Sequence, residues 1–219
     1  MPVLRVINVG LEEGEITEES NFRVGRMNLT YSSNDVQWSP IHQYSNIIAT
    51  AATNSALVVW DLDLPSSQKQ DRVITEHERA INRVAFHPTE ALHLLSASQD
   101  GAIKLWDLRE KSTSSVATFQ GKADGVRDVQ FSPTDQYQFV AAFENGTIQR
   151  WDIRQPQKFE QRINAHSGPI FALEWHHEGR YVATGSRDKT IRVRFSVFVG
   201  VKMSNLRCFY TLLGHISSI

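Results

Sequence analysis

A tryptophan followed by an aspartate recurs at a nearly fixed interval, and this interval limits the possible folds more than any other feature. Trp60, Trp106 and Trp151 are each followed by aspartate, and they are separated by 46 and 45 residues (106 − 60 and 151 − 106). A constant period of this length indicates an architecture built from repeated structural units.

Each unit has the pattern of four short antiparallel strands. Six residues before each tryptophan stands a turn former, namely Asn54, Asp100 or Asn145, and glycine follows the last two, which is typical of a hairpin turn. Apolar segments precede the turns ("NIIATAAT", "LHLLSAS", "FVAAF"), and before them come further strand-like segments ("DVQWSP", "NRVAFHP", "RDVQFSP"). A fourth strand, such as "DRVIT" or "SVATF", follows the tryptophan. This pattern predicts the blades of a β-propeller, whose faces both pack on neighbouring blades, so that the middle strands are almost continuously apolar.

The repeated segments resemble the WD-repeat family. In the second repeat the residues that the family uses as a structural tetrad are all present: His77, Ser98, Asp100 and Trp106. The resemblance implies a hydrogen-bonded relay in which the turn aspartate holds the histidine, the histidine meets the serine, and the serine meets the indole. Such a relay gives each buried polar group a partner.

The other repeats match this tetrad in part. The first repeat has Asn54 and Trp60, with Leu29 and Ala52 at the remaining two positions. The third has Asn145 and Trp151, with Lys122 and Phe143. A fourth copy, "IFALEWHHEGRYVATGSRDKTIRV", has His166, Ser186 and Asp188, with Arg194 in place of tryptophan.

These matches predict an all-β fold with about four complete four-stranded blades and partial blades at both ends, which is an incomplete ring. We expect residues 1–28 to end a preceding blade, with "VLRVINV" and "NFRVG" as its last strands. The segmentation then gives repeats at 29–75, 76–120, 121–164 and 165–213, and "LLGHISSI" places the start of a fifth repeat at 214–219.

The pattern changes from about residue 194. The segment "DKTIRVRF" has Arg194-Phe195 where the repeat predicts Trp-Asp, and the next histidine equivalent, His215, comes later than the spacing of the other repeats. Two interpretations remain open for residues 194 to 210: translated non-coding sequence, or a divergent strand with a longer loop. No functional residue is assigned beyond Val193.

The order of several segments is similar to one group within the WD-repeat family, the WD-repeat subunit of the SEA/GATOR complex. The segments include "NFRVGR", "KQDRVITEHERAINRVAFHPTEA", "SQDGAIKLWDLR", "FENGTIQRWDIRQP" and "AHSGPIFALEWH". The resemblance implies a non-enzymatic subunit that binds other protein subunits and regulates TOR complex 1 in response to amino acids. It also implies a cytoplasmic location, peripheral to the vacuole or lysosome membrane through the complex.

Composition argues against several other functions. The net charge of −1 provides no field that would attract nucleic acid, and the longest apolar run, "FSVFVGV", is too short to span a bilayer. The single cysteine, Cys208, excludes a disulfide within the chain and a cysteine zinc cluster. We expect no cofactor, no metal, no direct membrane insertion and no small-molecule substrate.

Catalytic interpretations of the motifs are weaker than structural ones. His77, Ser98 and Asp100 are the residue types of a hydrolase triad, but no G-x-S-x-G nucleophile turn is present, and other repeats replace these residues. His176-His177 could ligate a metal, but they fall at a position where other repeats have turns ending in proline. The sequence therefore predicts no catalytic residue.

Two groups of charged residues are candidates for partner binding. Arg79, Asp124 and Arg127 fall in the loops that enter the blades, although a solvated charged rim is the favoured explanation of these charges. Arg109 and Arg154 end "WDLR" and "WDIR", which resemble the motif by which WD proteins dock on the adaptor of cullin-4 ubiquitin ligases. The alternative function is therefore a substrate receptor of such a ligase.

Overall fold

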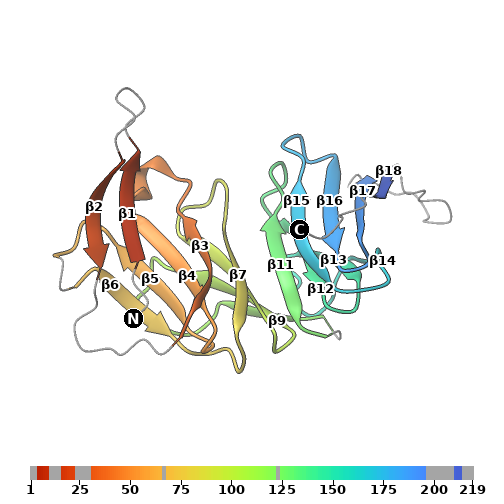
Figure 1. The fold of residues 1–219 in the computed structure, drawn as a ribbon. Coiled ribbons are helices and arrows are strands. Elements are labelled where there is room, and N and C mark those ends of the chain that lie inside the picture. The colour runs from red at the N-terminus through yellow and green to blue at the C-terminus, as the bar shows by residue number, and fades with distance from the viewer. Residues whose placement is uncertain are drawn as a thin grey trace.

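The described part of the chain consists mainly of short antiparallel strands (Figure 1). The computed structural model describes residues 4–9, 16–22, 31–65, 68–121, 124–195 and 210–213. Four four-stranded sheets, here called blades 1 to 4, follow one another along the chain, and each has its strands in sequence order. No helix within these residues is long and apolar enough to cross a membrane.

The bounds of the strands are as follows. Blade 1 contains β3 (Ser33–Trp38), β4 (Ile47–Ala52), β5 (Leu57–Asp61) and β6 (Gln70–Ile74), with a 3₁₀ turn, η1 (His42–Tyr44), between its first two strands. Blade 2 contains β7 (Ile81–Phe86), β8 (His93–Ser98), β9 (Ala102–Asp107) and β10 (Ala117–Gln120). Blade 3 contains β11 (Val126–Phe131), β12 (Gln138–Phe143), β13 (Thr147–Asp152) and β14 (Gln161–Asn164). Blade 4 contains β15 (Ile170–Trp175), β16 (Tyr181–Ser186), β17 (Thr190–Phe195) and β18 (Tyr210–Leu213).

The apolar core lies mainly between neighbouring blades. One cluster joins blades 1 and 2 and includes Leu57, Val84 and Trp106, and another joins blades 2 and 3 around Phe119 and Trp151. A third cluster joins blade 3 to blade 4. Middle strands that are buried on both faces explain the continuous apolar segments of the sequence. The all-β propeller fold expected from the sequence is confirmed.

Two strands lie outside the four blades. β1 (Leu4–Val9) pairs with β2 (Ile16–Phe22) in an antiparallel two-stranded sheet. The strand expected at "VLRVINV" corresponds to β1, whereas "NFRVG" overlaps only the end of β2, and its last residues lie outside the described part. The start of a fifth repeat, expected at 214–219, also lies outside it.

Blade 4 continues through the unusual residues Arg194 and Phe195. Arg194 pairs with Val182 in β16, and β18 pairs with β17 in the same register that β14 has with β13. The connection between β17 and β18 covers residues 196–209, against 153–160 in blade 3. This pairing shows where the strands lie and does not decide between the two interpretations of residues 194 to 210 given above.

The first strand of every blade carries an irregularity at the same position. The register shifts between Ser33 and Asp35 in β3, and the equivalent shifts in β7, β11 and β15 leave Asn82, Arg127 and Phe171 without a cross-strand partner. Such a β-bulge redirects a side chain away from its own sheet. The bulged Asn34 donates to the carbonyl of Ile81 at 2.8 Å.

Polar side chains connect these first strands from blade to blade. The first strands β3, β7, β11 and β15 contact one another in turn, but they belong to separate sheets and share no backbone ladder. Asp35 and Gln37 of β3 accept the backbone N–H groups of Val84 and Phe86 in β7. The other connections of this kind are Asn82 to the Val126 carbonyl, Asp128 to the Leu173 N–H and Gln130 to the Trp175 N–H.

One arginine extends this network across three blades. Arg83 of β7 lies 3.2 Å from Asp35 of β3 and 3.2 Å from Asp128 of β11. Asp128 is almost fully buried, and burial raises its pKa to about 6, although Arg83 and the N–H groups of Leu173 and Val129 oppose this rise. The ionised carboxylate therefore depends on the donors that surround it.

Replacement of Asp128 by asparagine tests this network. Both carboxylate oxygens accept hydrogen bonds, so the amide group of Asp128→Asn must place a donor against a donor. We expect the free energy of unfolding to fall by about 1–3 kcal/mol, measured by urea unfolding. Asp63→Asn, an exposed position, is the control.

The pH dependence of this loss has a defined sign. The folded-state pKa of Asp128 is raised above the ordinary value of about 3.9. Its carboxyl group therefore contributes most at low pH, and this contribution declines as pH rises through about 6. Asparagine does not titrate, so Asp128→Asn should cost more stability at pH 4 than at pH 7; an equal or smaller cost at pH 4 contradicts the assignment.

Candidate protein-interaction surface

Blade 2 contains a complete hydrogen-bonded relay, but its serine is Ser96. Nδ1 of His77 lies 2.8 Å from Asp100, and Nε2 of His77 lies 2.7 Å from the Ser96 hydroxyl. The Trp106 indole donates to the same hydroxyl at 2.9 Å. The assignment of Ser98 from the sequence is therefore wrong. Ser96 lies ten residues before the tryptophan, nearer to the indole along the paired strands.

Ser98 has a different role at the end of β8. It lies opposite Ile81 at the start of β7, and its hydroxyl is 3.0 Å from the carbonyls of both Arg79 and Ala80. The same oxygen accepts the backbone N–H of Asp100. Ser98 therefore ties the loop that enters blade 2 to the hairpin turn.

Blade 4 repeats this arrangement with a threonine. His166 lies 2.9 Å from both Asp188 and the Thr184 hydroxyl. Ser186, the sequence-based choice, instead donates to the carbonyls of Gly168 and Pro169, as Ser98 does in blade 2. Arg194 stands at the tryptophan position, so this relay ends at the threonine.

Blades 1 and 3 keep only parts of the relay. In blade 1, Trp60 donates to Thr50 at 3.1 Å, and Thr50 is the equivalent of Ser96, where the sequence assignment was Ala52. Blade 3 has Ala141 at this position, and the buried Nε1 of Trp151 has no hydrogen-bond partner. The side chains of Asn54 and Asn145 accept N–H groups within their own turns. Leu29 and Lys122 lie outside the described residues.

The burial and the charge state of the relay residues indicate a structural role. His77, Ser96 and Trp106 are each at most 4% exposed. Burial alone would raise the pKa of Asp100, but hydrogen bonds from His77 and from backbone N–H groups hold it at about 2. Burial lowers the pKa of His166, which favours a neutral imidazole at pH 7.

His176 and His177 lie in a surface turn after β15. Their ring centroids are 4.2 Å apart, and Nδ1 of His176 accepts the backbone N–H of Glu178. Within the described ranges, no group of three or more His, Cys, Asp or Glu side chains could hold a metal ion. The turn interpretation is the one that the hydrogen bond supports.

The candidate partner-binding residues divide between the two ends of the blades. Arg79 precedes β7, and Asp124 and Arg127 lie at the start of β11, whereas Arg109 and Arg154 follow the third strands β9 and β13. First and third strands run in the same direction because each is antiparallel to the second. The first three residues therefore mark the entry end, and the other two mark the opposite, exit end.

At the entry end the charges are open to solvent or paired. Arg79 and Asp124 are exposed. Arg127 lies 2.6 Å from Glu144 and above the ring of Phe171. This end is therefore a charged rim whose exposed side chains are accessible to a partner protein.

At the exit end the two arginines fold back on the preceding aspartates. Arg109 lies 2.5 Å from Asp107 and holds its pKa at about 2, and Arg154 lies 2.5 Å from Asp152 and lowers its pKa. Both guanidinium groups stay more than half exposed. Arg154 also lies 4.1 Å above the centroid of the Tyr137 ring.

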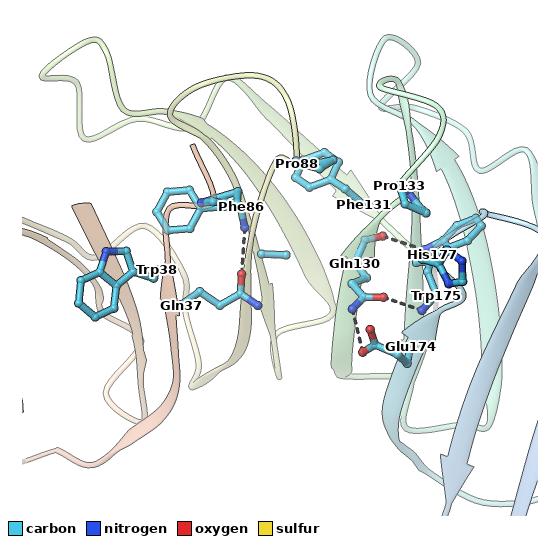
Figure 2. A pocket seen from close by; sticks show the side chains of 12 residues that line it. Gln37, Trp38, Phe86, Pro88, Gln130, Phe131, Pro133, Glu174, Trp175 and His177 are labelled. Carbon is cyan, nitrogen blue, oxygen red and sulfur yellow. Dashed lines mark hydrogen bonds between the residues drawn. The ribbon is translucent and has the colours of Figure 1, made fainter. Parts of the chain in front are cut away.

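The exit end also holds a cavity of about 340 Å³ between the first strands, here called the exit pocket (Figure 2). Its lining repeats from blade to blade. Each first strand contributes its last aromatic residue: Trp38, Phe86, Phe131 and Trp175. Two positions further along come Pro40, Pro88, Pro133 and His177. Gln37, Gln130 and Glu174, each one residue before an aromatic position, also line it (Figure 2).

Sequence reasoning did not identify the exit pocket. The signal was present, because an aromatic residue followed two positions later by proline recurs in "DVQWSP", "NRVAFHP" and "RDVQFSP". These segments were interpreted only as strand ends and turns. Their convergence on one cavity depends on the blades lying side by side.

Comparison with known families agrees with this fold. A family model described as "Nucleolar protein 10-like, N-terminal domain", a β-propeller family, matches residues 41–198. The chain belongs to this β-propeller family. A chain in the crystal structure of a mitotic checkpoint complex superposes on this one with a TM-score of 0.70 and 19% sequence identity. The matched region covers 89% of this chain and 55% of the other chain. This likeness shows the fold alone.

Several curated proteins are much more similar in sequence. The GATOR2 complex protein WDR24 of Danio rerio is 50% identical over 186 residues, and that of Homo sapiens is 50% identical over 185 residues. Each comparison covers 84% of this chain and 23% of the relative, so the chain spans about a quarter of their length. Restriction of telomere capping protein 1 of Lachancea thermotolerans is 34% identical over 171 residues, which is 67% of this chain and 13% of that protein. The resemblance to the WD-repeat subunit of the SEA/GATOR complex is confirmed.

The role of Ser96 can be tested by two substitutions. Ser96→Ala leaves His77 Nε2 and Trp106 Nε1 without their shared partner, so the free energy of unfolding should fall by about 1–3 kcal/mol. Ser96→Thr keeps the hydroxyl, as Thr50 and Thr184 do in blades 1 and 4, and should cost much less. Denaturant unfolding at pH 7 measures both, and equal losses in the two variants would show that the hydroxyl is not the important group.

Blade 3 offers the reverse experiment. Ala141→Ser places a hydroxyl where Ser96 stands in blade 2, within reach of the unpaired Trp151 Nε1. We expect stability to rise by about 0.5–1.5 kcal/mol. Ala142→Ser is the control, because its side chain points to the opposite face of β12, and it should destabilise the protein. A loss of stability in both variants contradicts the prediction.

Proposed function

We propose that this chain is the propeller part of a non-catalytic scaffold subunit in a GATOR2-type complex. The observation that carries the proposal is the identity of about half of the aligned residues with proteins named for that complex, over 84% of the chain. The two WDR24 relatives are named as proteins of a complex, and none of the three relatives is named for a catalytic activity.

The arrangement of the blades supports a binding role. Polar side chains fix the first strands to one another, and the described polar clusters of blades 2 and 4 are buried within relays. The exposed chemistry lies at the two ends, in the charged entry rim and the exit pocket. A rigid framework with exposed loops at its ends is suited to holding other proteins.

The proposal of a finer role rests on the resemblance to the WD-repeat subunit of the SEA/GATOR complex. We infer that the complex regulates TOR complex 1 in response to amino acids, and that the protein acts on the cytoplasmic side of the vacuole or lysosome membrane through its partners. The partners are other protein subunits, without nucleic acid or a small-molecule substrate.

The alternative is a substrate receptor of a cullin-4-type ligase. The observation in its favour is the exposed pair Arg109 and Arg154, each following a Trp-Asp pair at the exit end. Because both guanidinium groups are already bound by an aspartate, an adaptor would have to share or replace that contact.

Affinity purification of the full chain, followed by mass spectrometry, separates the two functions. The scaffold proposal predicts recovery of the other GATOR2-type subunits, unchanged in an Arg109→Ala/Arg154→Ala variant, and no cullin-4 adaptor. Deletion of the protein should also alter the response of TOR complex 1 substrate phosphorylation to amino acids. Recovery of the adaptor without those subunits, lost in the double variant, would overturn the proposal.

A further inference from the structure

The exit pocket combines apolar walls with a single acidic group. Among the residues that line it, Glu174 is the only aspartate or glutamate, and there is no lysine or arginine. Glu174 is exposed, and one of its carboxylate oxygens accepts a hydrogen bond from Gln130 Nε2 at 3.0 Å. The pocket therefore presents one carboxylate on one wall, and the His177 imidazole is the other ionisable group of its lining.

The neighbouring glutamines hold this wall in place. Oε1 of Gln130 accepts the N–H of Trp175 at 2.8 Å, and Oε1 of Gln37 accepts the N–H of Phe86 at 3.3 Å. Gln130 thus links β11 to β15 with one end of its amide and orients Glu174 with the other (Figure 2). The carboxylate is positioned before any ligand arrives.

Aromatic rings and prolines form the remaining walls. Phe131 and Trp175 lie on the same side of the pocket as Glu174, and Trp38 lies on the opposite side (Figure 2). A planar guanidinium stacks on aromatic rings and binds a carboxylate through two parallel hydrogen bonds. The same combination already exists at this end of the molecule, where Arg154 lies over Tyr137 and pairs with Asp152.

We propose that the exit pocket binds an arginine side chain of a partner polypeptide. The guanidinium group pairs with Glu174, its flat face lies against the aromatic wall, and the partner's flanking residues contact the prolines. This inference rests on the proposed function as a protein-binding scaffold and names the chemistry of one contact. Charge complementarity selects this occupant, because a neutral segment brings no opposite charge to the carboxylate and an acidic one is repelled.

The test uses the full chain and a fluorescein-labelled peptide of alanine, serine and glycine with one central arginine. Two matched peptides carry citrulline or lysine instead, and binding is followed by fluorescence polarisation. We expect the citrulline peptide to bind about tenfold more weakly, which corresponds to about 1.4 kcal/mol. The lysine peptide should bind with intermediate affinity, because an ammonium group pairs with the carboxylate but does not stack as a plane.

Glu174→Gln removes the charge and keeps a side chain that can accept from Gln130. It should weaken the arginine peptide about tenfold and leave the citrulline peptide unchanged. The control is Glu178→Gln, an exposed carboxylate that pairs with Arg180 outside the pocket lining, and it should have no effect. Thermal melting verifies that both variants are folded.

The inference is overturned if arginine and citrulline peptides bind alike, or if Glu174→Gln binds as wild type does. Co-purification with the complex is a separate readout. If the protein assembles normally but does not bind the arginine peptide, the proposed ligand of the exit pocket is wrong and the proposed scaffold function is unaffected. Arginine binding that depends on Glu174, in a protein that does not join the complex, rejects the proposed function and keeps the pocket.

Discussion

The structure depends on hydrogen bonds that cross from the first strand of one blade to the first strand of the next. Backbone ladders stabilise each sheet internally, but none joins two blades among the described residues, so apolar packing and side chains must do this. A β-bulge at the same place in every first strand directs Asn34 and Asn82 to the neighbouring backbone. After the bulges of β3 and β11, an aspartate and a glutamine accept N–H groups of the next first strand that would otherwise lack partners. This linkage places the four strand ends together at the exit pocket.

Within each blade, a second arrangement gives the buried polar groups their hydrogen-bond partners. A hydroxyl ten residues before the tryptophan position joins the middle strands to a histidine or an indole, as Ser96 does in full and as Thr50 and Thr184 do in part. Blade 3 has lost this hydroxyl, and its tryptophan is held by aromatic packing against Phe119 and Phe139. Apolar contact thus keeps the blade folded where the relay is absent.

The sequence predicted the parts of this structure that depend on local periodicity. The spacing of tryptophans, turn residues and apolar segments was sufficient for the blades, because each strand and turn has its own signal. It failed for Ser98 and Ser186, because counting from the turn aspartate could not show which of two hydroxyl residues on the same face of the strand reaches the histidine. The bulges, the blade-to-blade bonds and the exit pocket were also missed, since they arise only when distant segments lie side by side.

These features support a rigid framework whose ends carry the interactions, and the bonds between first strands are its central element. Hydrogen exchange of single amides in the full chain tests them most directly. The side chains of Gln37 and Gln130 accept hydrogen bonds from the backbone N–H groups of Phe86 and Trp175 in the next first strand. In β7 the equivalent position is Ala85, which has no side-chain acceptor for the N–H of Phe131 in β11. The account predicts slow exchange at Phe86 and Trp175, and faster exchange at Phe131. Equal exchange at all three amides would contradict the claim that these side chains hold the blades together.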